Sequence, residues 1–379
     1  MDCMGELRMS APIVEIANVT KVFGEVVAVD NVSLTIEERD FLILLGPSGC
    51  GKTTILRMIA GLEIPTSGEI FLKDRCVFSS RKGIFVPARE RGVGLVFQSY
   101  ALWPHMNVFE NVAFGLKVKR MKSEVTRERV NRVLSYMRLD GMEIRYPQEM
   151  SGGEQQRVAL ARMLVSEPDI FLMDEPLSNL DAKLRLEMRA EIKNIHYQTG
   201  ATTVYVTHDQ IEGQTMANRI AVIDNGVIQQ IDRPKKVYHR PSNLFVADFI
   251  GSPPINKVEG TLVIRGNAED GTVEVKNELF SLVTAYKNVR TGTDAVAAIR
   301  PENISVVSEP GMNTIEVEVQ TILPSGPETI LQVRYDRILF SILITREVDL
   351  EVGQKISIFF PPEHILLFDK HSESLLPLM

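Results

Sequence analysis

Four residues between positions 46 and 53 have the types and spacing of a phosphate-binding loop. Gly46, Gly51, Lys52 and Thr53 fit G-x-x-x-x-G-K-[ST] within the stretch FLILLGPSGCGKTTILRMIAGL. Glycines let successive backbone N–H groups converge on phosphate oxygens. We expect Lys52 to place its charge between the β- and γ-phosphates of a nucleotide, and the Thr53 hydroxyl to coordinate Mg²⁺. A glycine-rich turn with a surface lysine is the alternative, but the flanking strand and helix patterns favour the phosphate loop.

A second group of reactive residues follows the apolar run DIFLMDEP (169–176). Neighbouring strand residues point to opposite faces, so Asp174 and Glu175 should have different functions. Phosphoryl transfer to water needs one acidic group near Mg²⁺ and another group that orients the attacking water. We assign the metal to Asp174 and the role of general base to Glu175. A solvated acidic turn is the alternative, and the phosphate loop upstream argues against it.

Two further polar residues follow apolar runs that read as strands. His208 lies in VYVTHDQ (204–210), and Gln98 lies in VFQSYALWPHM (96–106). Open α/β sheets bind ligands at the carboxyl ends of their strands. There His208 could reach the γ-phosphate, and the Gln98 amide could coordinate Mg²⁺ or orient a water. A surface or helix-start histidine is the simpler interpretation of His208 when it is taken alone.

The stretch MSGGEQQRVALAR (150–162) places a serine and two glycines before a helical pattern. A helix N-terminus presents unpaired N–H groups and a partial positive charge, which together attract anions. The stretch has no lysine at the position that a phosphate loop requires. It is therefore a second anion-binding element of a different kind.

The elements that would position these residues alternate between strand and helix over the first 240 residues. Apolar stripes at helical spacing predict helices over 124–139 and 183–197. Short β-rich runs predict strands at 13–19, 41–45, 93–97, 169–173, 202–206 and 219–223. This alternation predicts an α/β fold with a mainly parallel sheet.

The pattern changes near FIGSPPIN (249–256), beyond which short alternating runs are separated by turn residues. These runs predict an all-β domain of barrel or sandwich type. The predicted organisation is a flexible N-terminus (1–12), an α/β domain (13–248) with a helical subdomain at about 99–165, and a β-rich domain (249–379).

Composition limits the function classes. The 379 residues are 44% hydrophobic with a net charge of −7, which argues against nucleic acid as a main partner. The three cysteines form no disulfide framework or metal pair, and no apolar run is long enough for a signal peptide or a membrane span. We expect a soluble, cytoplasmic protein whose link to any membrane depends on a partner.

Together, the phosphate loop, SGGEQQR and IFLMDEP resemble the ATPases of ABC transporters. SGGEQQR resembles the ABC signature, LSNLDAKLR (177–185) the D-loop, VTHD the H-loop, and Gln98 stands at the Q-loop position. The resemblance implies bound ATP and Mg²⁺, with Thr53, Gln98 and Asp174 at the metal. It also implies nucleotide contacts from a larger set of residues: Phe23 stacked on adenine, Gly46, Pro47, Ser48, Gly49, Cys50, Gly51, Lys52, Thr53, Thr54, Ser151, Gly152, Gly153, Glu154 and Asp181.

Longer stretches resemble the sugar-importer branch of that family: FQSYALWPHMNVFENVAFGLK, SNLDAKLR, DFIGSPPIN and AIRPENI. That branch carries a C-terminal regulatory domain of OB-like (TOBE-type) β-structure. Importers of polyamines, ferric iron and anions share much of this layout, and FIGSPP favours sugars. The chain departs from the usual signature at Met150 and at Glu154, where leucine and glutamine are usual.

The resemblance implies a head-to-tail homodimer in which Ser151, Gly152 and Gly153 of one chain cover the ATP on the Lys52 loop of the other. Two membrane permease subunits would dock around Gln98 and SYALWPHM (99–106), which contains the only tryptophan, Trp103. A periplasmic or lipoprotein solute-binding protein would act indirectly. The chain would lie on the inner face of the cell membrane.

Three alternatives come from other classes. A phosphate-loop kinase would leave SGGEQQR without a function. A soluble ABC ATPase of translation would carry two cassettes, and one of DNA repair a long coiled coil, neither of which the sequence contains. A nucleic-acid-binding OB domain would need basic and aromatic residues, whereas TVEVKNELF and IEVEVQ are rich in acids.

Overall fold

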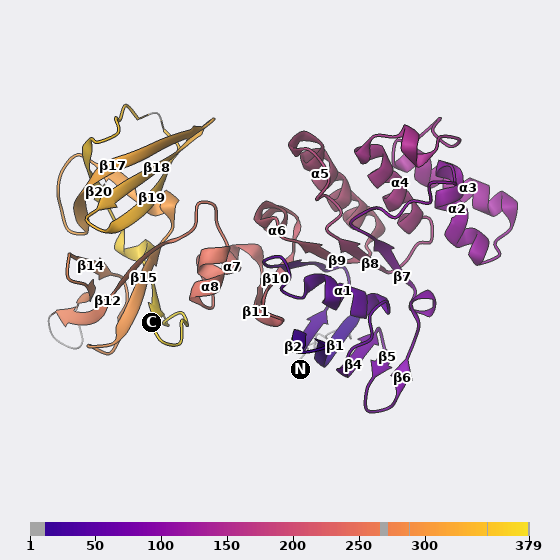
Figure 1. Cartoon of the computed structure of the whole chain (residues 1–379), viewed down its shortest axis with the longest axis horizontal. Helices are drawn as coiled ribbons and strands as arrows, with labels where there is room; N and C mark the ends of the chain where they lie inside the picture. Colours follow the sequence, from indigo (N-terminus) through magenta and orange to yellow (C-terminus); the bar gives the residue numbers. More distant parts are fainter. Residues whose placement is uncertain (1–11, 266–271, 288, 347, 378–379) are drawn as a thin grey trace, which may run out of the picture. The chain divides into compact units, whose positions relative to one another are not determined.

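The structure is a computed structural model that describes residues 12–265, 272–287, 289–346 and 348–377. The chain divides into two compact units, of which the first ends at Pro234 and the second begins at Lys235. Figure 1 shows the helices and strands of both units. The predicted flexible N-terminus lies outside the described residues, except for Pro12.

A six-stranded sheet forms the centre of the first unit, in the order β11-β10-β3-β9-β8-β7. Its strands are β3 (Phe41–Leu45), β7 (Val93–Val96), β8 (Ile170–Asp174), β9 (Thr202–Thr207), β10 (Arg219–Asp224) and β11 (Val227–Asp232). All neighbours pair in parallel except β10 and β11. β3, β8 and β9 are buried along their whole length, as parallel strands covered on both faces are. The predicted, mainly parallel sheet is confirmed, and its parallel strands end at one common edge.

A second sheet of the first unit, which the sequence analysis did not predict, is antiparallel throughout. Its order is β2-β1-β4-β5-β6. The strands are β1 (Val14–Phe23), β2 (Val26–Ile36), β4 (Ser67–Leu72), β5 (Arg75–Ser79) and β6 (Ile84–Phe85). Register shifts interrupt the pairing of β1 with β2 and with β4, and these irregularities hide the two-residue period in the sequence.

The helices of the first unit form two sets. α1 (Lys52–Ala60), α5 (Ala182–Thr199) and α6 (Gln210–Met216) follow strands of the central sheet or loops at its edge. Figure 1 shows α2 (Val108–Val118), α3 (Ser123–Tyr136) and α4 (Gly152–Leu164) grouped together, within the range predicted for the helical subdomain. No helix in the described part of the chain is long and apolar enough to cross a membrane.

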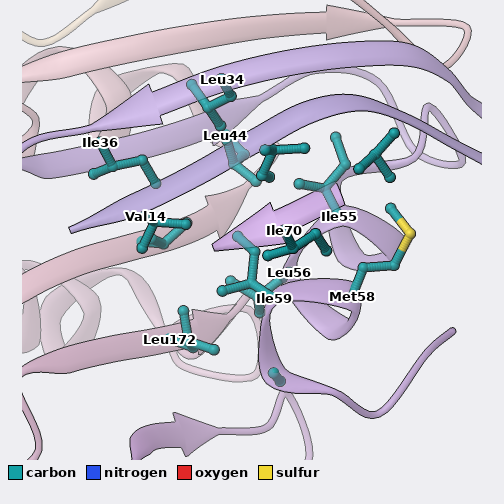
Figure 2. Close-up of a cluster of buried hydrophobic side chains, with 14 of the residues drawn as sticks. Val14, Leu34, Ile36, Leu44, Ile55, Leu56, Met58, Ile59, Ile70 and Leu172 are labelled. Carbon is teal, nitrogen blue, oxygen red and sulfur yellow. The ribbon is translucent and has the colours of Figure 1, made fainter. Parts of the chain in front are cut away.

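The hydrophobic core of the first unit holds α1 against both sheets, as Figure 2 shows. Ile55, Leu56, Met58 and Ile59 of α1 are fully buried. They share one cluster with side chains of the two sheets: Val14, Leu34, Ile36 and Ile70 from the antiparallel sheet, and Leu44 and Leu172 from the central sheet. Each such side chain contributes roughly 1.5–3 kcal/mol of burial free energy. The loop that precedes α1 is therefore fixed at both ends.

The second unit contains short helices followed by β-structure. α7 (Pro234–His239) and α8 (Leu244–Phe249) come first. One antiparallel sheet has the order β14-β13-β12-β15-β21, with β12 (Asn256–Arg265), β13 (Thr272–Lys276), β14 (Ser281–Thr284), β15 (Asp294–Ile299) and β21 (Leu366–Asp369). The other has the order β16-β20-β17-β18-β19, with β16 (Ser305–Val307), β17 (Thr314–Ser325), β18 (Glu328–Tyr335), β19 (Ile338–Ile344) and β20 (Lys355–Phe359). The described residues after Phe249 contain no α-helix, as the sequence predicts.

The division between the units comes before the position that the sequence suggested, because α7 and α8 belong with the β-structure. Arg300, which is buried, donates hydrogen bonds to the carbonyls of Tyr238, Ala247 and Ile250. Its guanidinium also lies over the Tyr238 ring, 4.2 Å from the ring centroid. The Gly-Ser-Pro-Pro cluster at 251–254 is thus a turn inside the second unit.

Candidate active site

The loop between β3 and α1 has the backbone geometry of an anion-binding cradle. A Cβ on Gly46 would lie 2.1 Å from the carbonyl oxygen of Ile223, so only glycine fits there. Gly51 has φ +104° and precedes α1 without any side-chain cap on the helix. The first N–H groups of α1 are therefore left for a ligand.

The other loop residues differ in exposure. Ser48 and Gly49 are exposed, Pro47 and Thr54 are partly buried, and Cys50 is buried. Lys52 is only 4% exposed, and its Nζ donates to the carbonyl oxygens of Gly46 (2.8 Å) and Pro47 (2.6 Å). Burial raises the pKa of the Cys50 thiol, while the nearby Lys52 ammonium acts in the opposite direction. The structure thus holds the Lys52 charge inside the loop.

Thr53 and Asp174, both predicted to bind the metal, lie in direct contact. The Thr53 hydroxyl donates to Asp174 Oδ1 over 2.7 Å, across 121 positions of sequence. Burial raises the pKa of the Asp174 carboxyl, while the Thr53 hydrogen bond and the Arg57 guanidinium, 3.6 Å away, act in the opposite direction. A hydroxyl beside a carboxylate is the donor set that Mg²⁺ prefers in nucleotide sites, so these residues fit the metal.

Glu175 and His208 form a second pair at the same edge of the sheet. His208 Nδ1 lies 3.1 Å from Glu175 Oε2. Glu175 has φ +44°, an uncommon value for a residue other than glycine, and its N–H donates to the carbonyl of Val206. The turn after β8 therefore directs Glu175 toward the residues that follow β9.

Gln98 and Phe23 are both exposed. Gln98 follows β7, and its backbone carbonyl accepts a hydrogen bond from Asn179 Nδ2 at 3.2 Å. Phe23 ends β1 with 46% of its surface exposed, and Lys21 Nζ lies 4.5 Å from the ring centroid. An exposed ring can stack on a base. The roles of both residues remain predictions.

Ser151 and Glu154 form a reciprocal capping box at the start of α4. Ser151 Oγ accepts from the Glu154 N–H at 3.4 Å, and Glu154 Oε2 accepts from the Ser151 N–H (2.7 Å) and hydroxyl (2.8 Å). These hydrogen bonds lower the pKa of the Glu154 carboxyl. Gly152 is exposed and Gly153 is buried against Leu184. Within the described residues, no hydrogen bond or ion pair joins residues 151–154 to residues 46–54.

Asp181 begins α5, and its carboxylate accepts a hydrogen bond from the Leu184 N–H at 3.0 Å. Three charged residues near the predicted site were not predicted from the sequence. Arg57 contacts Asp174, and Arg185 and Arg189 of α5 contact Asp209, the neighbour of His208. The two α5 arginines are four residues apart and so lie on one helix face, but this spacing does not identify their partner.

The predicted docking surface includes Trp103, which is partly buried. Its ring lies 4.3 Å from that of Phe114, centroid to centroid, and the Arg162 guanidinium lies over it at 4.9 Å. A cavity of about 360 Å³ lies nearby, lined by Met106, Glu110, Phe114, Lys117 and Val118. An apolar hollow on an exposed helix face is typical of an interface.

Two family models match this chain: ABC transporter over residues 29–178 and TOBE domain over residues 297–368. The chain is 44% identical over 364 residues to the trehalose/maltose import ATP-binding protein MalK of Thermococcus litoralis, covering 94% of this chain and 97% of that protein. It is 43% identical over 363 residues to the maltose/maltodextrin import ATP-binding proteins MalK of Salmonella typhimurium and Escherichia coli, covering 94% of this chain and 95% of each relative.

Solved structures match more than half of the chain. A dimeric post-hydrolysis state of the ATP-binding cassette MJ0796, bound to ADP and Pi, has a TM-score of 0.52 and 33% identity, covering 58% of this chain and 98% of that one. CbiO1 of Clostridium perfringens, part of the ABC transporter complex cbiONQ, has a TM-score of 0.55 and 25% identity, covering 60% and 91%. Sequence and fold thus agree with the predicted resemblance, and the chain belongs to the ATP-binding proteins of ABC transporters, with a TOBE domain in its second unit.

Proposed function

We propose that this ABC-family ATPase is the subunit of a sugar importer that converts ATP hydrolysis into solute uptake. The observation that carries the proposal is the pairing at the sheet edge, where Thr53 meets Asp174 and Glu175 meets His208. These two contacts support the assignment of a metal-binding pair next to a base and its partner, which hydrolysis of a phosphoanhydride requires.

The chain's own residues divide the chemistry between them. The N–H groups at the start of α1 and the Lys52 ammonium bind the β- and γ-phosphates of ATP. Thr53 and Asp174 would hold Mg²⁺, with Gln98 as a further ligand, and the ion would supply positive charge to the phosphate oxygens. Glu175 takes a proton from the attacking water. At the same time the water oxygen bonds to the γ-phosphorus, and the bond between the γ-phosphorus and the β-phosphate oxygen breaks.

We infer that two chains complete each site, in a head-to-tail homodimer. The start of α4 presents a serine and glycines but has no residue equivalent to Lys52, so its ligand is held by another chain. His208 completes the site around the γ-phosphate, and Asp181 lies in the loop that faces the partner. The relative MJ0796 is described as a dimer, which supports this arrangement.

We infer that the apolar surface around Trp103 and Phe114 binds two membrane permease subunits, which place the chain on the inner face of the membrane. The cavity of about 360 Å³ beside Phe114 would receive a segment of the permease. A periplasmic or lipoprotein solute-binding protein acts through the permeases.

The TOBE-containing unit serves regulation and dimerisation. Nucleic acid is not a partner in this proposal.

Sugar is the solute class that the relatives support, because their names specify maltose, maltodextrin and trehalose. Reconstitution with the co-encoded permeases and binding protein tests this assignment. Stimulation of ATP hydrolysis by a sugar is the expected result. Stimulation by a polyamine, ferric iron or an anion instead would replace sugar with that solute.

The chemical assignment is tested by Glu175→Gln, which removes the base but keeps the size of the side chain. We expect turnover to fall by about 10²–10⁴-fold with ATP binding retained, and ATP-dependent dimers to accumulate. Steady-state hydrolysis, equilibrium nucleotide binding and sedimentation measure these effects. Full turnover in the variant would remove Glu175 as the base.

A further inference from the structure

His208 is the exposed member of the proposed catalytic pair. Its side chain is 54% exposed, whereas that of Glu175 is 17% exposed. An exposed side chain at a strand end has several accessible rotamers, so holding it 3.1 Å from Glu175 requires a well-fixed backbone. The residues on either side of His208 supply that support.

Asp209, which follows His208, uses its two carboxylate oxygens for different purposes. Oδ1 accepts from the N–H groups of Ile211 (2.8 Å) and Glu212 (3.2 Å) and so caps α6. Oδ2 accepts from Arg189 Nη2 at 2.8 Å, and Arg185 Nη1 lies 3.8 Å away. One carboxylate therefore ties the start of α6 to two arginines of α5.

Thr207, on the other side of His208, belongs to a buried network. Its hydroxyl oxygen accepts from the Asp209 N–H at 3.0 Å. Glu212 is 3% exposed and accepts from the Tyr205 hydroxyl at 2.9 Å, and Arg189 Nη2 lies 3.9 Å from Glu212 Oε1. Buried, hydrogen-bonded groups of this kind restrict the backbone that carries them.

Arg185 links this network to the loop that precedes α5. Its Nη2 donates to the carbonyl of Leu180 at 3.0 Å, while Nη1 faces Asp209. Arg185, Asp209, Glu175 and His208 also line one small cavity of about 40 Å³. The arginine–carboxylate contact therefore borders the proposed catalytic pair directly.

We propose that Asp209 is a positioning residue for hydrolysis, whose ion pair with Arg189 holds His208 against Glu175. The inference rests on the proposed function of Glu175 and His208. Asp209 reaches neither the metal pair nor the phosphate loop through any hydrogen bond among the described residues. It acts on the reaction through the backbone of its neighbour.

Asp209→Asn separates the two purposes of the side chain. The amide oxygen still caps α6, but the ion pair with Arg189 is lost. We expect kcat for ATP hydrolysis to fall about 10-fold or more, because His208 is no longer held against Glu175. KM should change less than about 2-fold, and the melting temperature should be nearly unchanged. Asp169→Asn is the matched control, since it breaks an exposed 2.7 Å pair with Lys73 and should leave kcat unchanged.

Arg189 variants test the same ion pair without altering the cap, and they decide the question if Asp209→Asn does not fold. Arg189→Met should lower kcat as Asp209→Asn does, and Arg189→Lys should restore part of it. The double variant should be no slower than the worse single variant. A wild-type kcat in Asp209→Asn or in Arg189→Met, or fully additive losses in the double variant, would overturn the inference.

Measuring Glu175→Gln alongside these variants distinguishes the proposed catalytic function of Glu175 and His208 from the proposed positioning role of Asp209. An inactive Glu175→Gln with a fully active Asp209→Asn removes only the role of Asp209. A fully active Glu175→Gln removes the catalytic pair itself.

Discussion

The N-termini of α1 and α4 can be compared directly. Both have the sequence pattern of an anion site, but only α1 begins without a side-chain cap. α1 begins after Gly51 with no side-chain cap, and Lys52 lies at its first position. Ser151 is the N-cap of α4, and Glu154 of the same chain accepts from both the N–H and the hydroxyl of that serine. The first helix leaves its donors for a ligand, whereas at the second helix the Glu154 carboxylate engages both donors of Ser151.

The capping box gives Glu154 a structural role at the start of α4. A carboxylate caps a helix well and interacts favourably with its positive end. For Ser151 to donate to a phosphate, its hydroxyl must leave Glu154. In this sense the start of α4 is a closed site, because Glu154 engages both donors of Ser151.

The largest expected effect in this comparison comes from Lys52→Met, which removes the cation of the open site. Hydrolysis should fall by about 10²–10³-fold or more, because a preorganised charge aimed at the reacting phosphate is lost. Equilibrium nucleotide binding and steady-state hydrolysis measure the change. Lys73→Met, on the exposed surface, should behave like the unaltered chain. Unchanged hydrolysis in Lys52→Met would show that the loop is not the phosphate site.

A smaller effect is expected from Glu154→Gln at the closed site. Glutamine retains the acceptor of the capping box but loses the negative charge, so unfolding should need about 0.3–1 kcal/mol less free energy at neutral pH. Because the folded-state pKa of Glu154 is lowered, its stabilising effect is present above the unfolded pKa and is lost as pH falls through the folded pKa.

The stability difference between the unaltered chain and Glu154→Gln should therefore become smaller as the pH falls. Denaturant unfolding at neutral pH and at about pH 3 measures this, with Glu309→Gln, an exposed residue outside any helix, as the control. A stability difference that persists unchanged at the acidic pH would contradict the assignment of the effect to the Glu154 charge.

The parts of the molecule that the sequence predicts well are those with a strong local pattern. β3 has the predicted bounds, Phe41–Leu45, because every residue in it is apolar and buried. Asp174 ends β8 and Glu175 follows it in a turn, and their separate contacts with Thr53 and His208 agree with the different functions predicted for them. The bounds of β3 and the position of the two acids at a strand end depend on residues that are neighbours in the chain, whereas the partners of the acids are distant in sequence.

The antiparallel sheet was beyond the reach of pattern analysis. β2 alternates irregularly between exposed and buried residues, and β1 pairs with it through several register shifts. The predicted domain boundary at about residue 249 failed for a related reason. The Gly-Ser-Pro-Pro turn has the composition of a linker, but Arg300, some fifty positions later, bonds the carbonyls of Ala247 and Ile250.

The arginines near His208, Arg185 and Arg189, were also not predicted, because their contacts join residues that are distant in sequence. Arg185 and Arg189 lie on a helix whose sequence is rich in charges, where solvated side chains are the usual expectation. Their contact with Asp209 joins residues about twenty positions apart and depends on how α5 and α6 are placed. Only the tertiary structure supplies that information.

The central claim, that each ATP is held by Lys52 of one chain and Ser151 of another, can be tested with mixed dimers. Chains carrying Lys52→Met and chains carrying Ser151→Arg, each with Glu175→Gln to block turnover, are co-expressed with different tags and isolated together. Sites shared between chains leave one site intact, so the account predicts about one retained ATP per mixed dimer and none in either parent dimer. Retention of no ATP by the mixed dimer, with two ATP molecules retained by the Glu175→Gln dimer, would contradict it.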